Sequence, residues 1–258
     1  MNKIDFCVVL TVENANPNGD PNNGNIPRQD YEGYGEMSDV CIKRKIRDRL
    51  QDMGENILVK RSDRADDGFK SIKTRVDDYD LLKDEMDKKK PDVDACQSIA
   101  CANWIDVRSF GQVFGFKGNK PTATFSVRGP VSVRMARSVD VVDIEELSLT
   151  KSTNTHGDDE IKDSATMGKK YIATKGAYVT YGSIFPQLAD KTGFTDEDAE
   201  KIKFALETLL ENDATSARPS GSMAVASVYW WRHSSAIGQY PSIKVHRSLE
   251  FTPISTLE

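Results

Sequence analysis

Strand-like and helix-like segments alternate along this chain, and their order constrains the fold more than any other feature of the sequence. Residues 4–13 are rich in β-branched and aromatic side chains and predict a buried central strand. A helix is predicted to begin after Ser38, a favourable N-cap residue, and to end at Gly54. Its apolar residues fall on one narrow stripe at helical spacing: Ile42, Ile46, Leu50 and Met53.

The second half of the chain repeats the pattern. Thr195 and Asp198 form a capping box that opens a second helix, predicted to run to Glu211. Further strands are predicted at residues 106–111, 123–133 (broken at Gly129-Pro130), 171–184 and 224–231. The order strand, helix, strands, helix, strand is typical of the ferredoxin-like split βαβ arrangement, which RNA-recognition domains share. The predicted fold class is therefore α+β.

Two segments interrupt this order. Residues 55–103 mix clustered aspartates with lysines and predict a polar, partly helical insertion that contributes little to the core. Residues 150–170 contain almost no apolar side chains and predict an exposed hairpin or loop.

Composition sets limits on function. The chain of 258 residues carries a formal net charge of −5, which argues against nucleic-acid binding by bulk charge and leaves the question to local basic faces. Four cysteines without a Cys-x-x-Cys pair predict free thiols, and neither a metal nor a cofactor is expected. No apolar run is long enough to cross a bilayer, and the N-terminus resembles a strand more than a signal peptide, so we expect a cytoplasmic protein without membrane contact.

Residues 14–27 form a loop by every local rule, because Asn, Gly and Pro are turn residues. The spacing imitates a calcium-binding loop, but Asn25 stands where a bidentate Glu is required. Spacing alone favours a structural turn. The alternative is a surface of backbone N–H groups and amides that approaches a phosphate backbone, which Gly permits for lack of a side chain.

The first predicted helix carries a cluster of cations with Asp48 as the one anion among them. Such a face can neutralise several phosphates, whereas the simpler interpretation is a solvated surface. The cations are Lys43, Arg44, Lys45, Arg47 and Arg49.

Three smaller groups are candidates for phosphate or base contacts. Arg134 and Arg137 suit phosphate because a guanidinium donates two bonds at once, although Asp140 and Asp143 could pair with them instead. Met167 could unstack bases beside Lys169 and Lys170, or fold back on the core. Arg218 lies in a Gly/Ser/Pro loop and could reach a phosphate, an adjacent subunit or neither.

The sequence gives little reason to expect a catalytic site. His156, His233 and His246 have no partner arrangement for nucleophilic chemistry, and no phosphate-binding glycine motif is present. Asp20 and Asp30 are the only carboxylates that we consider for chemistry.

Several segments together resemble one family. They are Asn16–Arg28, Ser38–Arg47, Phe125–Val133, Ala136–Asp140, Thr166–Lys170, Phe194–Asp198 and Glu211–Arg218, in this order over nearly the whole chain. They are similar to the Cas-seven family of the RAMP superfamily, the CRISPR Cascade backbone subunits, and specifically to its type I-C (Dvulg) members.

The resemblance implies a single domain over residues 1–258. Its parts would be a ferredoxin-like, RNA-recognition-like (RRM-like) palm, a fingers or web insertion at residues 54–103, and an extended thumb hairpin at residues 145–170. It implies a non-catalytic subunit that polymerises along the guide RNA (crRNA) and presents the guide for pairing with target DNA. Expected partners are crRNA, target DNA through the heteroduplex, other copies of the chain, a guide-processing (Cas-five type) subunit and a large (Cas-eight type) subunit.

The residues expected to contact RNA combine these motifs: Asn18, Arg28, Lys43, Arg44, Lys45, Arg47, Arg134, Arg137, Met167, Lys169, Lys170 and Arg218. Two alternatives stay open. One is a Mg²⁺-dependent target-RNA endonuclease like the type III backbone proteins, with Asp20 as the catalytic carboxylate. The other is a single-copy RNA-binding module.

Overall fold

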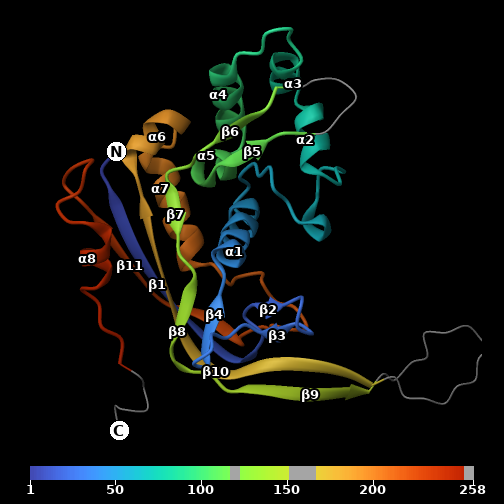
Figure 1. Cartoon of the computed structure of the whole chain (residues 1–258), viewed down its shortest axis with the longest axis vertical. Coiled ribbons are helices and arrows are strands. Elements are labelled where there is room, and N and C mark those ends of the chain that lie inside the picture. Colours follow the sequence, from blue (N-terminus) through green and yellow to red (C-terminus); the bar gives the residue numbers. More distant parts are fainter. Residues whose placement is uncertain (117–122, 151–166, 253–258) are drawn as a thin grey trace, which may run out of the picture.

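A seven-stranded antiparallel sheet organises the protein (Figure 1). The computed structural model describes residues 1–116, 123–150 and 167–252. The strand order is β11-β1-β10-β8-β4, and both β7 and β9 pair with β10, the longest strand. The strands are β1 (Ile4–Ala15), β4 (Tyr34–Met37), β7 (Val131–Val133), β8 (Ala136–Val141), β9 (Ile144–Thr150), β10 (Met167–Ile184) and β11 (Met223–Arg232).

Two helices, α1 (Asp39–Asp52) and α7 (Asp196–Glu207), pack on one face of the sheet. The predicted caps are confirmed: the Ser38 Oγ accepts a hydrogen bond from the Cys41 N–H over 3.2 Å, and Thr195 and Asp198 form the capping box. The apolar stripe of α1 and that of α7 join the same hydrophobic cluster as β1. The predicted first strand and both helices are thereby confirmed, with α7 ending four residues before the expected Glu211.

Alternation along the strands separates the two faces of the sheet. Phe6 and Leu10 on β1 and Tyr178 on β10 point toward the helices and are fully buried. The opposite face is covered at one end by α8 (Ser242–His246), whose His246 ring stacks on Tyr181 at 4.9 Å. The remainder of this face carries no helix among the described residues (Figure 1). We call this whole side of the sheet, opposite α1 and α7, the open face.

A second hydrophobic cluster lies apart from the sheet, formed by residues 58–127. The elements that contribute are α2 (Ile72–Asp78), α3 (Asp80–Met86), α4 (Val93–Asn103), α5 (Ile105–Phe110), β5 (Gln112–Phe114) and β6 (Phe125–Val127), and the short 3-10 helix η1 (Ser62–Arg64) lies at the surface beside them. Residues 58–127 thus form a core of their own, in which Phe114 stacks against Phe125 at 4.4 Å. The composition of residues 55–103 predicted only a small contribution to a core, and the cluster extends beyond these bounds. The strand predicted at residues 106–111 is wrong, since α5 occupies it.

The hairpin of β9 and the first half of β10 projects from the sheet at the end away from the helical insertion (Figure 1). Its register runs from Ala173 opposite Ile144 to Met167 opposite Thr150. Residues 151–166, with His156, and the side chain of Met167 lie outside the described residues, so the predicted wedge is not located. Within the described residues, no helix has the length and apolarity needed to cross a bilayer.

Candidate nucleic-acid interface

The Asn/Gly loop is a compact structure of its own, formed around the short strands β2 (Gly19–Asp20) and β3 (Ile26–Pro27). The Asn16 side-chain amide donates to the Asn25 carbonyl over 2.7 Å, and Asn16 is almost fully buried. A Cβ at Gly19 would lie 2.1 Å from the Asn25 Oδ1, so only glycine fits there. Internal packing therefore explains the glycine at position 19, as the structural interpretation of this loop expected.

Asn18 and Arg28 tie this loop to its neighbours. The Asn18 Oδ1 accepts a hydrogen bond from the Ser38 N–H over 2.8 Å, which connects the loop to the N-terminus of α1. The Arg28 N–H donates to the Asn18 carbonyl over 3.0 Å, and its guanidinium pairs with Asp20 at 3.3 Å. Arg28 keeps more than a third of its side chain exposed and can also reach a ligand.

The cations of α1 differ from the sequence-based expectation, because carboxylates of the helix itself and of distant segments pair with them. Lys43 pairs with Asp39 at 3.0 Å and keeps about a quarter of its side chain exposed. The Arg44 guanidinium donates to the Val59 carbonyl over 2.6 Å and so holds the insertion against α1. Of the four predicted phosphate contacts on α1, Lys43 is the one least committed to internal structure.

Lys45 and Arg47 are buried behind the surface. The Lys45 ammonium bonds to the Asp213 carboxylate, and burial lowers the pKa of Lys45 below its ordinary value. The Arg47 Nε donates to the Asp106 Oδ2 over 3.0 Å, and Asp106 is fully buried. Neither cation can contact a phosphate without breaking a desolvated ion pair, which is costly.

Arg134 and Arg137 lie on the open face. Tyr178 points to the helices, so its neighbour Val179 points to the open face. Arg137 is the ladder partner of Val179, and its side chain therefore points to the open face as well. Arg134 is exposed, with its guanidinium carbon 5.7 Å from the centre of the Tyr181 ring. These two arginines and the α1 cations therefore lie on opposite faces of the sheet.

Arg137 stacks over the Tyr34 ring at 4.2 Å and pairs with Asp30 and Glu32. The alternative partners considered from the sequence, Asp140 and Asp143, are wrong. About half of the Arg137 side chain is exposed, and exposed ion pairs of this kind are weak, so the guanidinium can exchange a carboxylate for a phosphate.

The sequence interpretation missed Lys175 on β10. Its ladder partner is Glu13, and the neighbouring pair Val12 and Gly176 faces the helices. Lys175 is therefore exposed on the open face. Counting back in steps of two from the open-face position 179 would have found it. Within the described residues Lys175 forms no ion pair.

The lysines at the base of the hairpin are also at the surface. The Lys169 ammonium pairs with the Glu146 carboxylate at 2.7 Å, and Glu146 also accepts from the Tyr171 hydroxyl over 2.8 Å. Lys170 is half-buried beside it. A Cβ at Gly24 would contact the Tyr171 ring at 3.9 Å, so the Asn/Gly loop and the base of the hairpin are neighbours.

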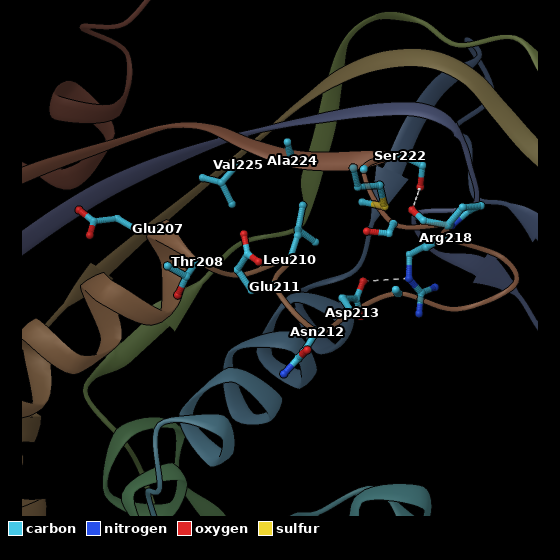
Figure 2. Close-up of a pocket in the computed structure, with 15 residues that line it drawn as sticks. Glu207, Thr208, Leu210, Glu211, Asn212, Asp213, Arg218, Ser222, Ala224 and Val225 are labelled. Atoms are coloured by element: carbon cyan, nitrogen blue, oxygen red, sulfur yellow. Dashed lines mark hydrogen bonds and ion pairs between the residues drawn. The ribbon is translucent and has the colours of Figure 1, made fainter.

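Arg218 is mostly internal (Figure 2). Its Nε donates to the Asp213 Oδ2 over 2.9 Å, and its Nη1 donates to the Asn16 carbonyl over 3.4 Å. The fold thus connects Arg218 to the Asn/Gly loop through the Asn16 carbonyl, a contact that the sequence did not predict.

The side chains of His233 and Ser183 meet at one buried carboxylate. His233 and Ser183 both bond to the buried Asp5, at 2.8 Å and 2.6 Å, so neither is oriented by the other. In the part of the chain that the structure describes, no three His, Cys, Asp or Glu residues could together hold a metal ion. The Asp20 carboxylate accepts from Arg28 and from the Asn22 N–H.

Comparison of the sequence with known proteins gives a family and a relative that share one description. The family model described as CRISPR-associated protein Cas7 matches residues 2–257. A protein of Haloferax volcanii described as CRISPR-associated protein Cas7 is 28% identical over 239 residues, which cover 86% of this chain and 68% of that protein.

The chain also matches two solved structures, and the first of them is similar in fold. A chain of a "CRISPR RNA-guided surveillance complex, pre-nicking" superposes with a TM-score of 0.55 at 16% identity, covering 89% of this chain and 78% of that one. A chain of a "CRISPR RNA-guided surveillance complex" gives a TM-score of 0.47 at 16% identity, covering 89% and 68%.

Proposed function

This chain belongs to the Cas7 family of CRISPR-associated proteins, and from that premise we propose that it is a non-catalytic backbone subunit that binds a CRISPR guide RNA. In this proposal many copies polymerise along the spacer of one crRNA in a type I-C Cascade complex. The guide is thereby held open for pairing with target DNA, and base pairing reads the sequence while the protein reads the backbone.

Strand order supports an RRM-like palm. If β7 and β8 count as one interrupted strand, the strands β11, β1, β10 and β8 are the fourth, first, third and second of the sheet. This is the order of the split βαβ fold with α1 and α7 as its two crossover helices. The insertion predicted at residues 54–103 would then form the fingers, together with the residues up to 127 that share its hydrophobic cluster, and the hairpin of β9 and β10 would form the thumb.

One observation carries the RNA-binding part of the proposal: Arg134, Arg137 and Lys175 are exposed on the same face of the sheet. Arg28, Lys169 and Lys170 would extend this surface around the Asn/Gly loop and along the thumb, and Lys43 would contact the guide from the other side of the sheet. Three or more cations without a base-reading element suit backbone recognition that is independent of sequence. Met167 would act at the thumb as a wedge between bases.

The other expected contacts take a different role in this proposal. Arg44, Lys45, Arg47 and Arg218 bond to carboxylates or carbonyls of the same chain, and Asn18 bonds to Ser38. They would hold the loop and the insertion in place and not grip phosphates. Further partners would be a Cas5-type guide-processing subunit and a Cas8-type large subunit, as the type I-C resemblance of Asn16–Arg28 and Thr166–Lys170 implies.

The proposal is tested by assembly on RNA of graded length. Purified chain is mixed with single-stranded RNAs of one repeat-derived handle and increasing spacer length, and the mass of each complex is measured. We expect the number of bound copies to rise in regular steps with spacer length, and scrambled spacers to bind equally well. One copy at every length would contradict the filament, and binding that depends on spacer sequence would contradict backbone recognition.

A further inference from the structure

A buried ion cluster joins two segments that lie far apart in the sequence. Asp213 lies in the loop between α7 and β11, beside a surface cavity of about 410 Å³ (Figure 2). Its Oδ2 bonds to the Lys45 ammonium of α1 and accepts from the Arg218 Nε over 2.9 Å. We call Lys45, Asp213 and Arg218 the Asp213 cluster.

The Asp213 cluster continues into the Asn/Gly loop at its first residues. The Arg218 Nη1 donates to the Asn16 carbonyl over 3.4 Å, and the Asn16 N–H donates to the Ala217 carbonyl over 2.8 Å. Asn16 in turn holds the far side of the loop through its bond to the Asn25 carbonyl. One carboxylate therefore connects α1, residues 213–218 and residues 16–25.

Burial shows that this connection faces inward. Lys45 is 4% exposed, and the side chains of Asp213 and Arg218 are 12% and 20% exposed. An ammonium buried this deeply depends on its carboxylate, because an unpaired charge at such a site is strongly unfavourable. Asp213 is thus the partner on which both cations depend.

We propose that Asp213 is a positioning residue for guide-RNA binding: by holding Lys45 and Arg218 it fixes the Asn/Gly loop, residues 14–27, in its RNA-binding conformation. This inference rests on the proposed function. It has a consequence opposite to simple electrostatics, since removing a negative charge near an RNA site ordinarily strengthens binding of a polyanion. In this protein, removal of the Asp213 charge weakens RNA binding instead, because the Asn/Gly loop loses the contacts that hold it.

The chain offers a matched control two residues away. Glu211 lies in the same loop, is exposed, and forms no ion pair among the described residues (Figure 2). Glu211→Gln removes the same unit of charge at nearly the same place without touching the Asp213 cluster. The comparison of Asp213→Asn with Glu211→Gln separates positioning from bulk charge.

The first measurement needs no RNA. Amide hydrogen exchange is followed in wild type, Asp213→Asn and Glu211→Gln. We expect the Asn16 and Asn25 amides to lose protection in Asp213→Asn alone, while the β1–β10 ladder stays protected in all three. Unchanged protection of the loop in a folded Asp213→Asn protein would overturn the inference whether or not the chain binds RNA.

The second measurement is the dissociation constant for a fluorescent single-stranded guide RNA over a series of salt concentrations. Asp213→Asn should raise Kd by about tenfold, the scale of one lost charge-assisted bond, and leave the salt slope unchanged. Glu211→Gln should leave Kd equal or lower. Binding by Asp213→Asn as tight as wild type overturns the inference, whereas absence of RNA binding by the wild type contradicts the proposed function instead.

A second variant keeps the test decisive if Asp213→Asn does not fold. Arg218→Lys retains the charge but cannot make both the bond to Asp213 and the bond to the Asn16 carbonyl in the same geometry. It should raise Kd at an unchanged salt slope and expose the Asn16 amide to exchange. Wild-type affinity together with wild-type protection in Arg218→Lys would overturn the inference.

Discussion

The Arg47 guanidinium and the Asp106 carboxylate join the two hydrophobic cores of the protein through a bond of 3.0 Å. Asp106 also accepts from the Leu58 and Val59 N–H groups, over 2.9 Å and 3.1 Å, and is fully buried. One carboxylate on α5 therefore anchors α1 of the sheet domain and the first residues of the insertion at the same point.

We expect Asp106→Ala to destabilise the protein by about 3 kcal/mol or more, because the change leaves the Arg47 charge and two N–H groups without a partner. Chemical denaturation monitored by tryptophan fluorescence measures the free energy of unfolding. Asp63→Ala, which removes an exposed partner of Arg61, serves as the control and should change that free energy by less than about 0.5 kcal/mol. Equal effects in the two variants would show that the Arg47–Asp106 connection is not needed.

Hydrophobic periodicity and capping residues predicted the elements that are stabilised by residues close to one another in the sequence. The strand at residues 4–13 and the helices capped by Ser38 and Thr195 are confirmed, because periodicity and capping depend on neighbours within one turn. The segment 106–111 was assigned to the wrong class. It is six residues long with only Val107 and Phe110 apolar, and periodicity over so short a segment does not separate a strand from a helix.

The environment of the α1 cations could not be predicted in the same way. Lys45 and Asp213 are separated by 168 residues, and no local rule indicates that they meet. A basic helix with one internal anion therefore suggested a positive surface, whereas tertiary contacts supply Asp106 and Asp213. Arg137 was identified correctly as an exposed cation, but its partners come from the loop before β4.

Arg137→Gln should weaken binding of single-stranded guide RNA for every spacer sequence tested. If Arg137 contacts one phosphate, the slope of log K against log salt should fall in magnitude by about 0.7. Arg232→Gln is a matched control, because Arg232 is also an exposed arginine with two carboxylate partners, Asp196 and Glu200, but lies on the edge strand β11. A slope that stays at the wild-type value in Arg137→Gln would remove Arg137 from the interface.

Asp20 distinguishes a backbone subunit from a nuclease. Its carboxylate is bonded to Arg28 at 3.3 Å and to the Asn22 N–H at 3.1 Å, so it stabilises the loop. We expect no Mg²⁺-dependent cleavage of RNA paired to the guide by the wild type, by Asp20→Ala or by Asp30→Ala. Cleavage by the wild type and Asp30→Ala that is lost in Asp20→Ala would establish the endonuclease alternative.

His246 should make the stability of the protein depend on pH. Burial lowers the pKa of this imidazole below its ordinary value, although the nearby Asp5 carboxylate opposes the shift. The unfolded chain therefore binds a proton at His246 more readily than the folded chain. As a result, the free energy of unfolding decreases as the pH falls below about 6.5. Above that pH the contribution is constant.

The test compares the free energy of unfolding at about pH 7.5 and about pH 5.5 in wild type and His246→Gln. The glutamine amide can still donate to the Gly182 carbonyl, which accepts from the His246 Nε2 over 3.1 Å, but it does not titrate. The loss of stability between the two pH values should therefore be smaller in the variant than in the wild type. An equal loss in both proteins would mean that another group, and not His246, is responsible for the acid sensitivity.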